Sequence, residues 1–277
     1  MDKSEIFRKI AAEVAQGELA FPTGAQLALK LRQALDDPNC QMEDAARLVQ
    51  AEPLLAARVI AIANSVAYNR FGQDISDVRL AVTRLGFRTV RSLAMALVAR
   101  QMAGQSADRA HQAMVNQLWE HTAHVASLAS MIARHVTRQD REAAMFAGIV
   151  HEIGGFYMLS RTADFPALLE GDFTEWVEGG EMEVGRAVLG KLAVPEAVAV
   201  AIEGYWDGFL AMPPATLADT LLLAEELAPV PSPLHRLVND NKGGRASIEM
   251  VIGEETLSLI LKESADEVRS LTDALQF

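Results

Sequence analysis

The chain has 277 residues, half of them hydrophobic, and a formal net charge of -12 at pH 7. A chain of this length and composition can bury roughly three quarters of the surface of its extended form, enough for one large core or two modest ones. Its acidic charge repels nucleic acid and anionic lipid, which argues against a nucleic-acid-binding protein unless the surface carries a local basic patch.

The single cysteine, Cys40, excludes an intrachain disulfide. The first residues contain no apolar core of a signal peptide. The longest apolar runs, such as residues 92–99, are far shorter than the roughly 20 residues that a membrane span needs. We therefore expect a cytoplasmic protein without a membrane span.

Helical periodicity runs through almost every segment, and no alternating stretch of β-branched residues predicts a sheet. The sequence therefore predicts an all-α fold. Residues 1–105 form the expected N-terminal helical subdomain, with Pro53 starting one helix and Gly86 separating two others. The helices predicted there span residues 4–16, 24–35, 42–50, 53–67, 75–85 and 87–101.

A second group of helices is expected in residues 106–230, after a joint at residues 104–106. The proline-rich residues 229–233 predict a stiff linker. Residues 231–277 then hold the end of this linker and one or two amphipathic helices, which either pack on the body or are available to a partner.

His121 lies on the apolar face of a predicted helix, because the hydrophobic residues around it follow one another in steps of three and four. These neighbours are Leu118, Val125, Leu128 and Ile132. A similar pattern places His151 on the buried side of the next helix, which we expect to end at Gly154 and Gly155. Two inward histidines from two helices can meet in the core.

Two histidines and an acidic residue are part of the metal-ligand set of a two-metal phosphohydrolase. Such a site must gather several deprotonated ligands, hold two ions about 3.5 to 4 Å apart and leave a position for water. His121, His151 and Glu152 supply only part of this set.

Segments spread over residues 17 to about 210 resemble, in order, the HDOD domain, a bacterial signalling output module related to the HD metal-dependent phosphohydrolases. The resemblance implies a compact all-helical body whose second half is HD-like. The segments that carry it are residues 21–23, 27–35, 52–58, 62–65 with Tyr68, 75–76, 81–86, 118–121, 147–154, 183–185 and 192–195.

The resemblance also implies a ligand set. His121 is similar to the first metal ligand of the HD enzymes, His151 to the histidine of their His-Asp dyad, and Asp219 to their distal aspartate. Glu152, however, stands where the dyad has aspartate. Its extra methylene moves the carboxylate by about 1.5 Å, beyond the roughly 0.5 Å that a catalytic arrangement tolerates.

Further histidines that HD enzymes place between the dyad and the distal aspartate have no counterpart. Glu181 and the pair Tyr205 and Trp206 stand where they are expected, and Gly155 replaces a basic residue after the dyad. The aromatic residues are expected to pack in the core.

Two functional hypotheses follow from this partial set. The first is a non-catalytic signalling regulator without a cofactor, which contacts other signalling proteins and keeps His121, His151, Glu152 and Asp219 as the vestige of an HD site. The alternative is a metal-dependent phosphohydrolase that uses the same four residues to hold Mn, Fe or Mg and cleaves a nucleotide or cyclic dinucleotide. Homo-oligomerisation stays open.

A basic stripe is formed by Arg84, Arg88 and Arg91, which follow at helical spacing. It predicts either a solvated helix face or a site for phosphate or an acidic partner, and it is the only local support for nucleic-acid binding.

The remaining histidines carry weaker expectations. His124, one turn beyond His121, is a candidate substitute ligand or a histidine at the solvent edge. We expect His111, His135 and His235 at the surface, because charged or turn residues surround them.

Overall fold

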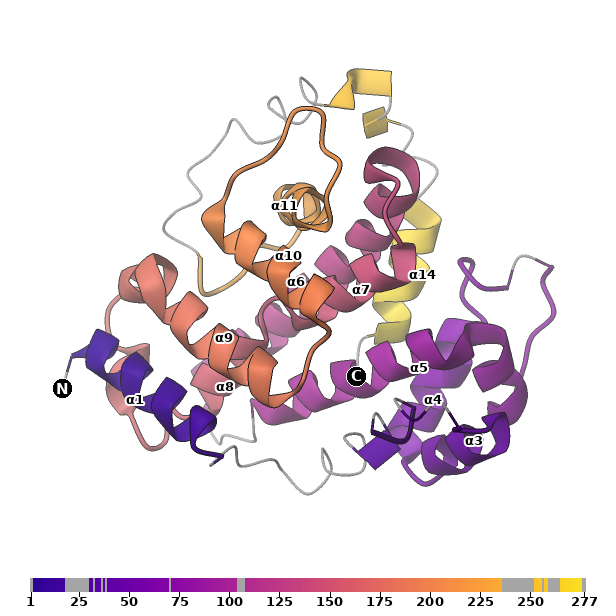
Figure 1. Ribbon diagram of the computed structural model, residues 1–277, viewed down its shortest axis with the longest axis horizontal. Helices are drawn as coiled ribbons and strands as arrows, with labels where there is room; N and C mark the ends of the chain where they lie inside the picture. Colours follow the sequence, from indigo (N-terminus) through magenta and orange to yellow (C-terminus); the bar gives the residue numbers. More distant parts are fainter. Residues whose placement is uncertain are drawn as a thin grey trace.

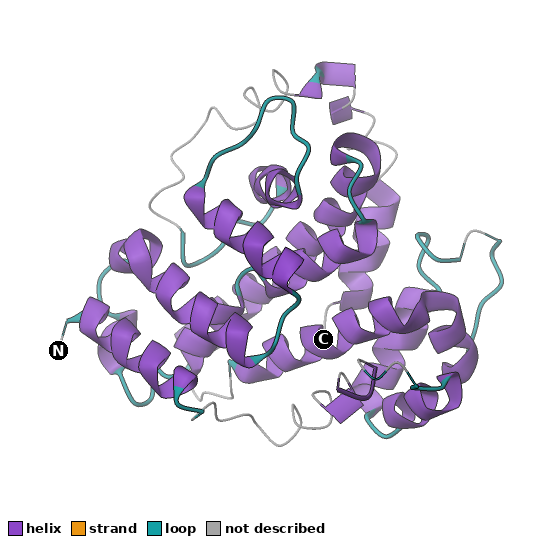
Figure 2. Cartoon of the chain, viewed as in Figure 1, coloured by secondary structure: helices purple, strands orange, loops and turns teal. Residues whose placement is uncertain are grey.

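The computed structural model describes residues 2–17, 39–69, 71–103, 108–235 and 265–275, with a few further positions between 30 and 37 and between 252 and 258. Within these residues every regular element is a helix (Figure 2), which confirms the predicted all-α fold. The joint expected at 104–106 lies outside the described residues, as does most of the helix expected at 24–35.

The N-terminal helices begin and end close to the predicted positions. Asp2 caps the first helix through a capping box with Glu5. Gly86 has φ 76° and ψ 165° inside the longest helix, so a break occurs where the sequence predicts it, at a residue that tolerates positive φ. These helices are α1 (Lys3–Ala15), α3 (Met42–Gln50), α4 (Pro53–Ala63) and α5 (Val78–Met102).

The second half of the chain supplies the helices that surround the histidines. Aspartates cap two of them: Asp108 accepts from Ala110 N, and Asp140 accepts from the backbone of Glu142 and Ala143. The helices are α6 (Arg109–Ile132), α7 (Arg141–Val150), α8 (Ile153–Ser160), α9 (Glu181–Lys191), α10 (Glu196–Asp207), α11 (Leu217–Leu227) and α14 (Ala265–Leu275), with short turns η1 (Ala133–Thr137), η2 (Pro166–Leu169) and η3 (Trp176–Gly180).

Helices α6 and α7 approach each other closely because Gly148 has no side chain. A Cβ atom at Gly148 would lie 2.5 Å from Ala126 Cα, so any other residue would push the two helices apart. Gly154 has the same function between α8 and α9, where its Cβ would lie 2.7 Å from Gly185 Cα. The expectation that Gly154 and Gly155 end a helix is wrong, because α7 ends at Val150 and both glycines lie within α8.

The core is continuous through both halves of the chain. Helix α1 packs against α9 and η3, away from α3 and α4 in Figure 1. The centroids of the Phe7 and Trp176 rings lie 5.3 Å apart in an edge-to-face arrangement. Helix α14 packs against α6 and α4. Helix α1 therefore packs against helices from the second half of the chain.

One apolar stretch, residues 141–160, is long and apolar enough to cross a membrane by length and composition. It comprises α7, α8 and the turn between them, and 89% of its apolar window is buried inside the structure. A mostly buried core helix passes the same test.

Candidate functional site

The two inward histidines meet, as their positions in the sequence predict. His121 comes from the middle of α6 and His151 from the end of α7, and both side chains are fully buried. Their Nε2 atoms lie 3.4 Å apart. His121 Nδ1 lies 2.8 Å from Val230 O, and His151 Nδ1 lies 2.7 Å from Gly148 O. A carbonyl oxygen only accepts, so in each ring Nδ1 is the donor.

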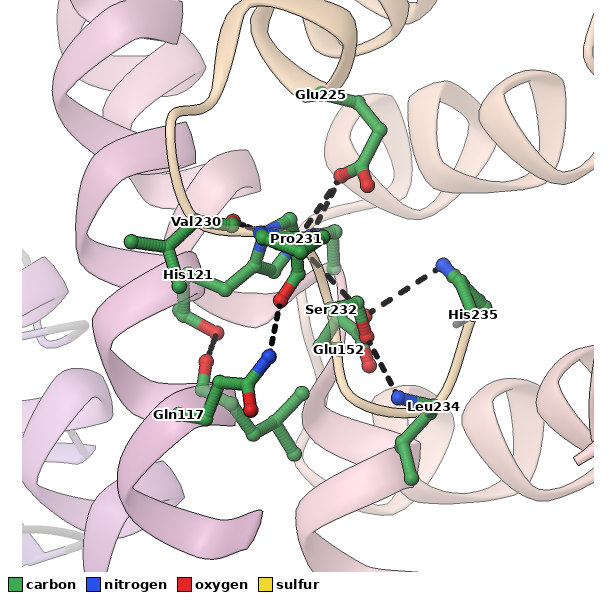
Figure 3. A network of polar contacts seen from close by, with 12 residues as sticks. Gln117, His121, Glu152, Glu225, Val230, Pro231, Ser232, Leu234 and His235 are labelled. Atoms are coloured by element: carbon green, nitrogen blue, oxygen red, sulfur yellow. Dashed lines mark hydrogen bonds and ion pairs between the residues drawn. The ribbon is translucent and has the colours of Figure 1, made fainter. Parts of the chain in front are cut away.

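A glutamate that the sequence interpretation missed joins the histidines. Glu225 Oε2, from α11, lies 3.1 Å from His121 Nε2 and 3.6 Å from His151 Nε2 (Figure 3). Its signal in the sequence is an acidic residue four positions after the buried Leu221, on the inward face of a helix.

Glu152 occupies the turn between α7 and α8, and its carboxylate is buried beside the histidines. Oε1 lies 3.9 Å from His121 Nε2, and neither oxygen has a hydrogen-bond donor within the part of the chain that the structure describes. Gly155 leaves room for this carboxylate, because a Cβ there would lie 3.0 Å from Glu152 Oε2. Ligand atoms of Glu152, His121 and His151 all lie within 4.8 Å of one another.

A segment after α11, residues 229–235, crosses over this cluster, and we call it the strap. Besides Val230 O, it provides Pro231 O, which accepts from Gln117 Nε2 at 3.0 Å (Figure 3). His235, at its end, places Nδ1 3.9 Å from Glu152 Oε1 and Nε2 3.0 Å from Glu181 Oε2.

Two expectations about histidines are therefore wrong. The His235 side chain is only 13% exposed, because the strap turns it inward toward Glu181. His111 is buried on α6, with Nε2 3.0 Å from Leu159 O. His135 is half-buried in η1.

Residues at the positions of the missing histidines have other partners. Glu181 Oε1 accepts from Trp206 Nε1 at 3.1 Å, while its other oxygen faces His235. The Tyr205 ring lies 5.7 Å from the His151 ring, edge to face. Burial, reinforced by nearby carboxylates, raises the pKa of Tyr205 well above its ordinary value.

Neighbouring carboxylates raise the pKa values of two histidines in the cluster. Burial lowers the pKa of His121, but Glu225, Glu152 and the Val230 carbonyl outweigh it and raise the value to about 9. Burial likewise opposes protonation of His235, and the hydrogen bond to Glu181 with the neighbouring carboxylates raises its pKa to about 10. The histidines hold the pKa of Glu225 far below its ordinary value despite burial.

Asp219, the distal aspartate implied by the resemblance, does not join the cluster. It is buried in the first turn of α11, where it accepts from Ala211 N, Ala215 N, Thr216 N and Thr216 Oγ1 at 2.7 to 2.9 Å. Burial raises its pKa, but these donors prevail and the net shift is downward. Its carboxylate therefore fixes the start of α11.

Replacement of Asp219 by alanine is expected to lower the free energy of unfolding by about 3 kcal/mol, because four donors lose a charged acceptor. Urea unfolding measures the loss. The exposed Glu226, later in the same helix, is the control, and Glu226→Ala is expected to change stability by less than about 0.5 kcal/mol. Equal effects of the two substitutions would contradict the capping assignment.

The effect of Asp219 should also depend on pH. Because its pKa is lower in the folded protein than the ordinary 3.8, its stabilisation is present above that value and is lost as the pH falls through the folded pKa. The difference in unfolding free energy between wild type and Asp219→Ala should therefore shrink between about pH 5 and pH 2. A difference that grows on acidification would contradict this sign.

The basic stripe is largely engaged with the chain itself. Arg84 donates to Ala63 O at 3.0 Å and to Gln73 O at 2.9 Å, which holds the end of α4 and the following loop. Arg88 pairs with Asp140, the cap of α7, and Arg91 is half-buried.

His124 does not reach the cluster. It lines a separate pocket of about 440 Å³ between α6 and α14, together with Leu128, Val268 and Thr272. Burial lowers its pKa.

The HDOD domain model matches residues 21–202, more than half of the chain. No curated protein matches the chain. A solved structure from Shewanella amazonensis SB2B, provisionally named a metal-dependent phosphohydrolase, is similar with a TM-score of 0.72, 20% identity and 98% of each chain covered.

A second solved structure is similar over the same extent. It is an HDOD domain protein with unknown function from Geobacter sulfurreducens, with a TM-score of 0.62, 22% identity and 98% of each chain covered. At these identities the likeness shows the fold alone.

Proposed function

Since the chain belongs to the HDOD domain family, we propose that it is a non-catalytic regulatory protein that transmits signals through contacts with other proteins. The observation that carries this proposal is the closure of the His-Glu cluster. The side chains of His121, His151 and Glu152 are buried completely, and the strap passes over His121 and Glu152 (Figure 3).

Closure argues against hydrolysis because a phosphoester must reach the ions and an attacking water needs an open position. The strap is attached on both sides of the cluster, by Gln117 and His121 on α6 and by Glu181 on α9. A substrate would have to displace these contacts.

The incomplete ligand set supports the same proposal. Asp219 is fully engaged in capping α11, and Glu181 is engaged with His235 and Trp206. Two ions about 3.5 to 4 Å apart need more bridging and terminal ligands than the remaining residues supply.

Contacts with other proteins are supported by exposed apolar side chains around α4 and the start of α5. Phe71 is 93% exposed in the loop between these helices, and Leu54, Val66 and Leu80 are at least half exposed. Large apolar groups that face solvent favour recognition of a partner protein.

A hydrolysis assay tests the proposal. Protein supplemented separately with Mn, Fe and Mg is expected to cleave a chromogenic phosphodiester no faster than the metal salts alone. The matched variant is His121→Asn. A metal-dependent turnover by wild type that His121→Asn abolishes would overturn the proposal.

One observation favours the alternative, a metal-dependent phosphohydrolase. Glu225 adds a fourth donor that the sequence resemblance does not supply, so the cluster is richer in ligands than a simple remnant. In this alternative the strap would have to open for substrate. The same assay separates the two functions.

A further inference from the structure

The tautomers of the two buried histidines leave an unbalanced centre. Val230 O and Gly148 O fix the protons of His121 and His151 on Nδ1, so in the neutral rings both Nε2 lone pairs point at each other across 3.4 Å. The carboxylates of Glu225 and Glu152 face the same point. Four electron-rich groups around one point need a cation between them.

The spacing of the two Nε2 atoms and the Glu225 carboxylate fits one small ion. Four ligands held tetrahedrally at 2.0 to 2.1 Å lie about 3.3 Å from one another. The observed separations from the Nε2 atoms are 3.1 Å and 3.6 Å to Glu225, 3.4 Å between the rings and 3.9 Å to Glu152. Glu152, whose Oε1 lies 3.9 Å from His121 Nε2, must move toward the ion to become the fourth ligand.

We propose that His121, His151, Glu152 and Glu225 bind a single divalent transition-metal ion of the zinc class. Two imidazoles and two carboxylates suit Zn²⁺, whereas Mg²⁺ and Ca²⁺ prefer an all-oxygen set. The carbonyls behind both rings are the partners that orient metal-bound histidines. The buried carboxylate of Glu152, without a hydrogen-bond donor among the described residues, is the group that most requires the ion.

Such a site is structural. Four protein ligands complete the tetrahedron and leave no position for water, which distinguishes it from a catalytic zinc site. The ion would fix α6, α7 and α11 to one another, and through the hydrogen bond from His121 to Val230 O it would also hold the strap. The inference is independent of the signalling function, because a regulator does not require the ion.

The competing occupant is a proton. A protonated His121 donates to Glu225 across 3.1 Å and also balances the charge. The two occupants differ in the amount of metal that each chain binds and in the visible absorption of the cobalt-loaded protein. A metal titration of the full chain therefore distinguishes them.

Zinc titration of chelator-stripped protein, followed by calorimetry and by elemental analysis after gel filtration, is the first test. We expect one tightly bound Zn²⁺ per chain, and a higher melting temperature after loading. Protein that retains no zinc after gel filtration would overturn the proposal and leave the proton as the occupant.

Glu225→Gln tests the one proposed ligand that the family resemblance does not imply. It is expected to weaken zinc binding by at least about 100-fold. Glu226→Gln, one residue further and exposed, is the control and should bind as wild type. Circular dichroism shows whether each variant is folded, and unchanged affinity in folded Glu225→Gln would reject the proposed site.

Cobalt substitution keeps the proposal testable if Glu225→Gln does not fold. Wild type loaded with Co²⁺ is expected to show the intense visible bands of four-coordinate tetrahedral cobalt, without phosphodiester turnover. Weak bands of six-coordinate cobalt would contradict a closed site. Tetrahedral cobalt together with turnover would instead refute the non-catalytic function and leave the ion site in place.

Discussion

Replacement of Gly148 by alanine is expected to lower the free energy of unfolding by about 3 kcal/mol, at the upper end of ordinary overpacking. The added Cβ would lie 2.5 Å from Ala126 Cα and 2.8 Å from Ala126 N, and backbone atoms cannot rotate away as a flexible side chain can. Helices α6 and α7 must therefore separate. Because these helices carry His121 and His151, we expect the variant also to bind zinc more weakly.

Gly190→Ala is the matched control for this substitution. Gly190 is also within a helix, and a Cβ there would meet nothing within 4 Å. Alanine at that position is expected to raise the free energy of unfolding by about 0.5 to 1 kcal/mol, because it reduces the conformational entropy of the unfolded chain. Urea unfolding of the two variants measures both effects. A Gly148→Ala protein as stable as Gly190→Ala would show that α6 and α7 are not in close contact.

Trp176→Ala has the second large effect, an expected loss of about 4 kcal/mol. The Trp176 side chain is completely buried and packs edge to face with Phe7, one of the residues through which α1 contacts the second half of the chain. Loss of the Trp176 side chain would leave a cavity directly beneath α1. We therefore expect the amide protons of α1 to lose protection from hydrogen exchange more than those of α6.

Phe209→Ala controls for the loss of a large aromatic residue, because its side chain is 77% exposed. It should change the free energy of unfolding by less than about 0.5 kcal/mol. Uniform loss of protection across α1 and α6 in Trp176→Ala would contradict the assignment of α1 to the second half through this contact.

The fold was accessible to sequence interpretation because its signals are local. Periodicity, Pro53 and Gly86 define helices without any knowledge of tertiary contacts, and the structure places a break at Gly86. The inward direction of His121 follows from the same periodicity. The prediction that Gly154 ends a helix was wrong because a glycine that ends a helix cannot be distinguished in sequence from one that allows a neighbouring helix to approach closely.

The site was less accessible, because its composition depends on contacts distant in sequence. Glu225 reaches His121 from a helix about a hundred residues later, and His235 turns inward only because Glu181 receives it. Asp219 matches the family pattern in position and type, but its local donors hold it at the start of α11. Local spacing places Glu225 on the same face of α11 as Leu221, but it does not show that this face meets the histidines.

The placement of α1 also depends on a distant contact. Phe7 and Trp176 are both ordinary buried aromatics in their own segments, and nothing local indicates that they meet.

A crystal structure of zinc-soaked protein, with anomalous scattering recorded at the zinc edge, tests the central claim most directly. We expect one ion about 2 Å from His121 Nε2, His151 Nε2 and a carboxylate oxygen of both Glu152 and Glu225, with the strap closed over it. Two ions about 3.5 to 4 Å apart, with water in an open position, would contradict it.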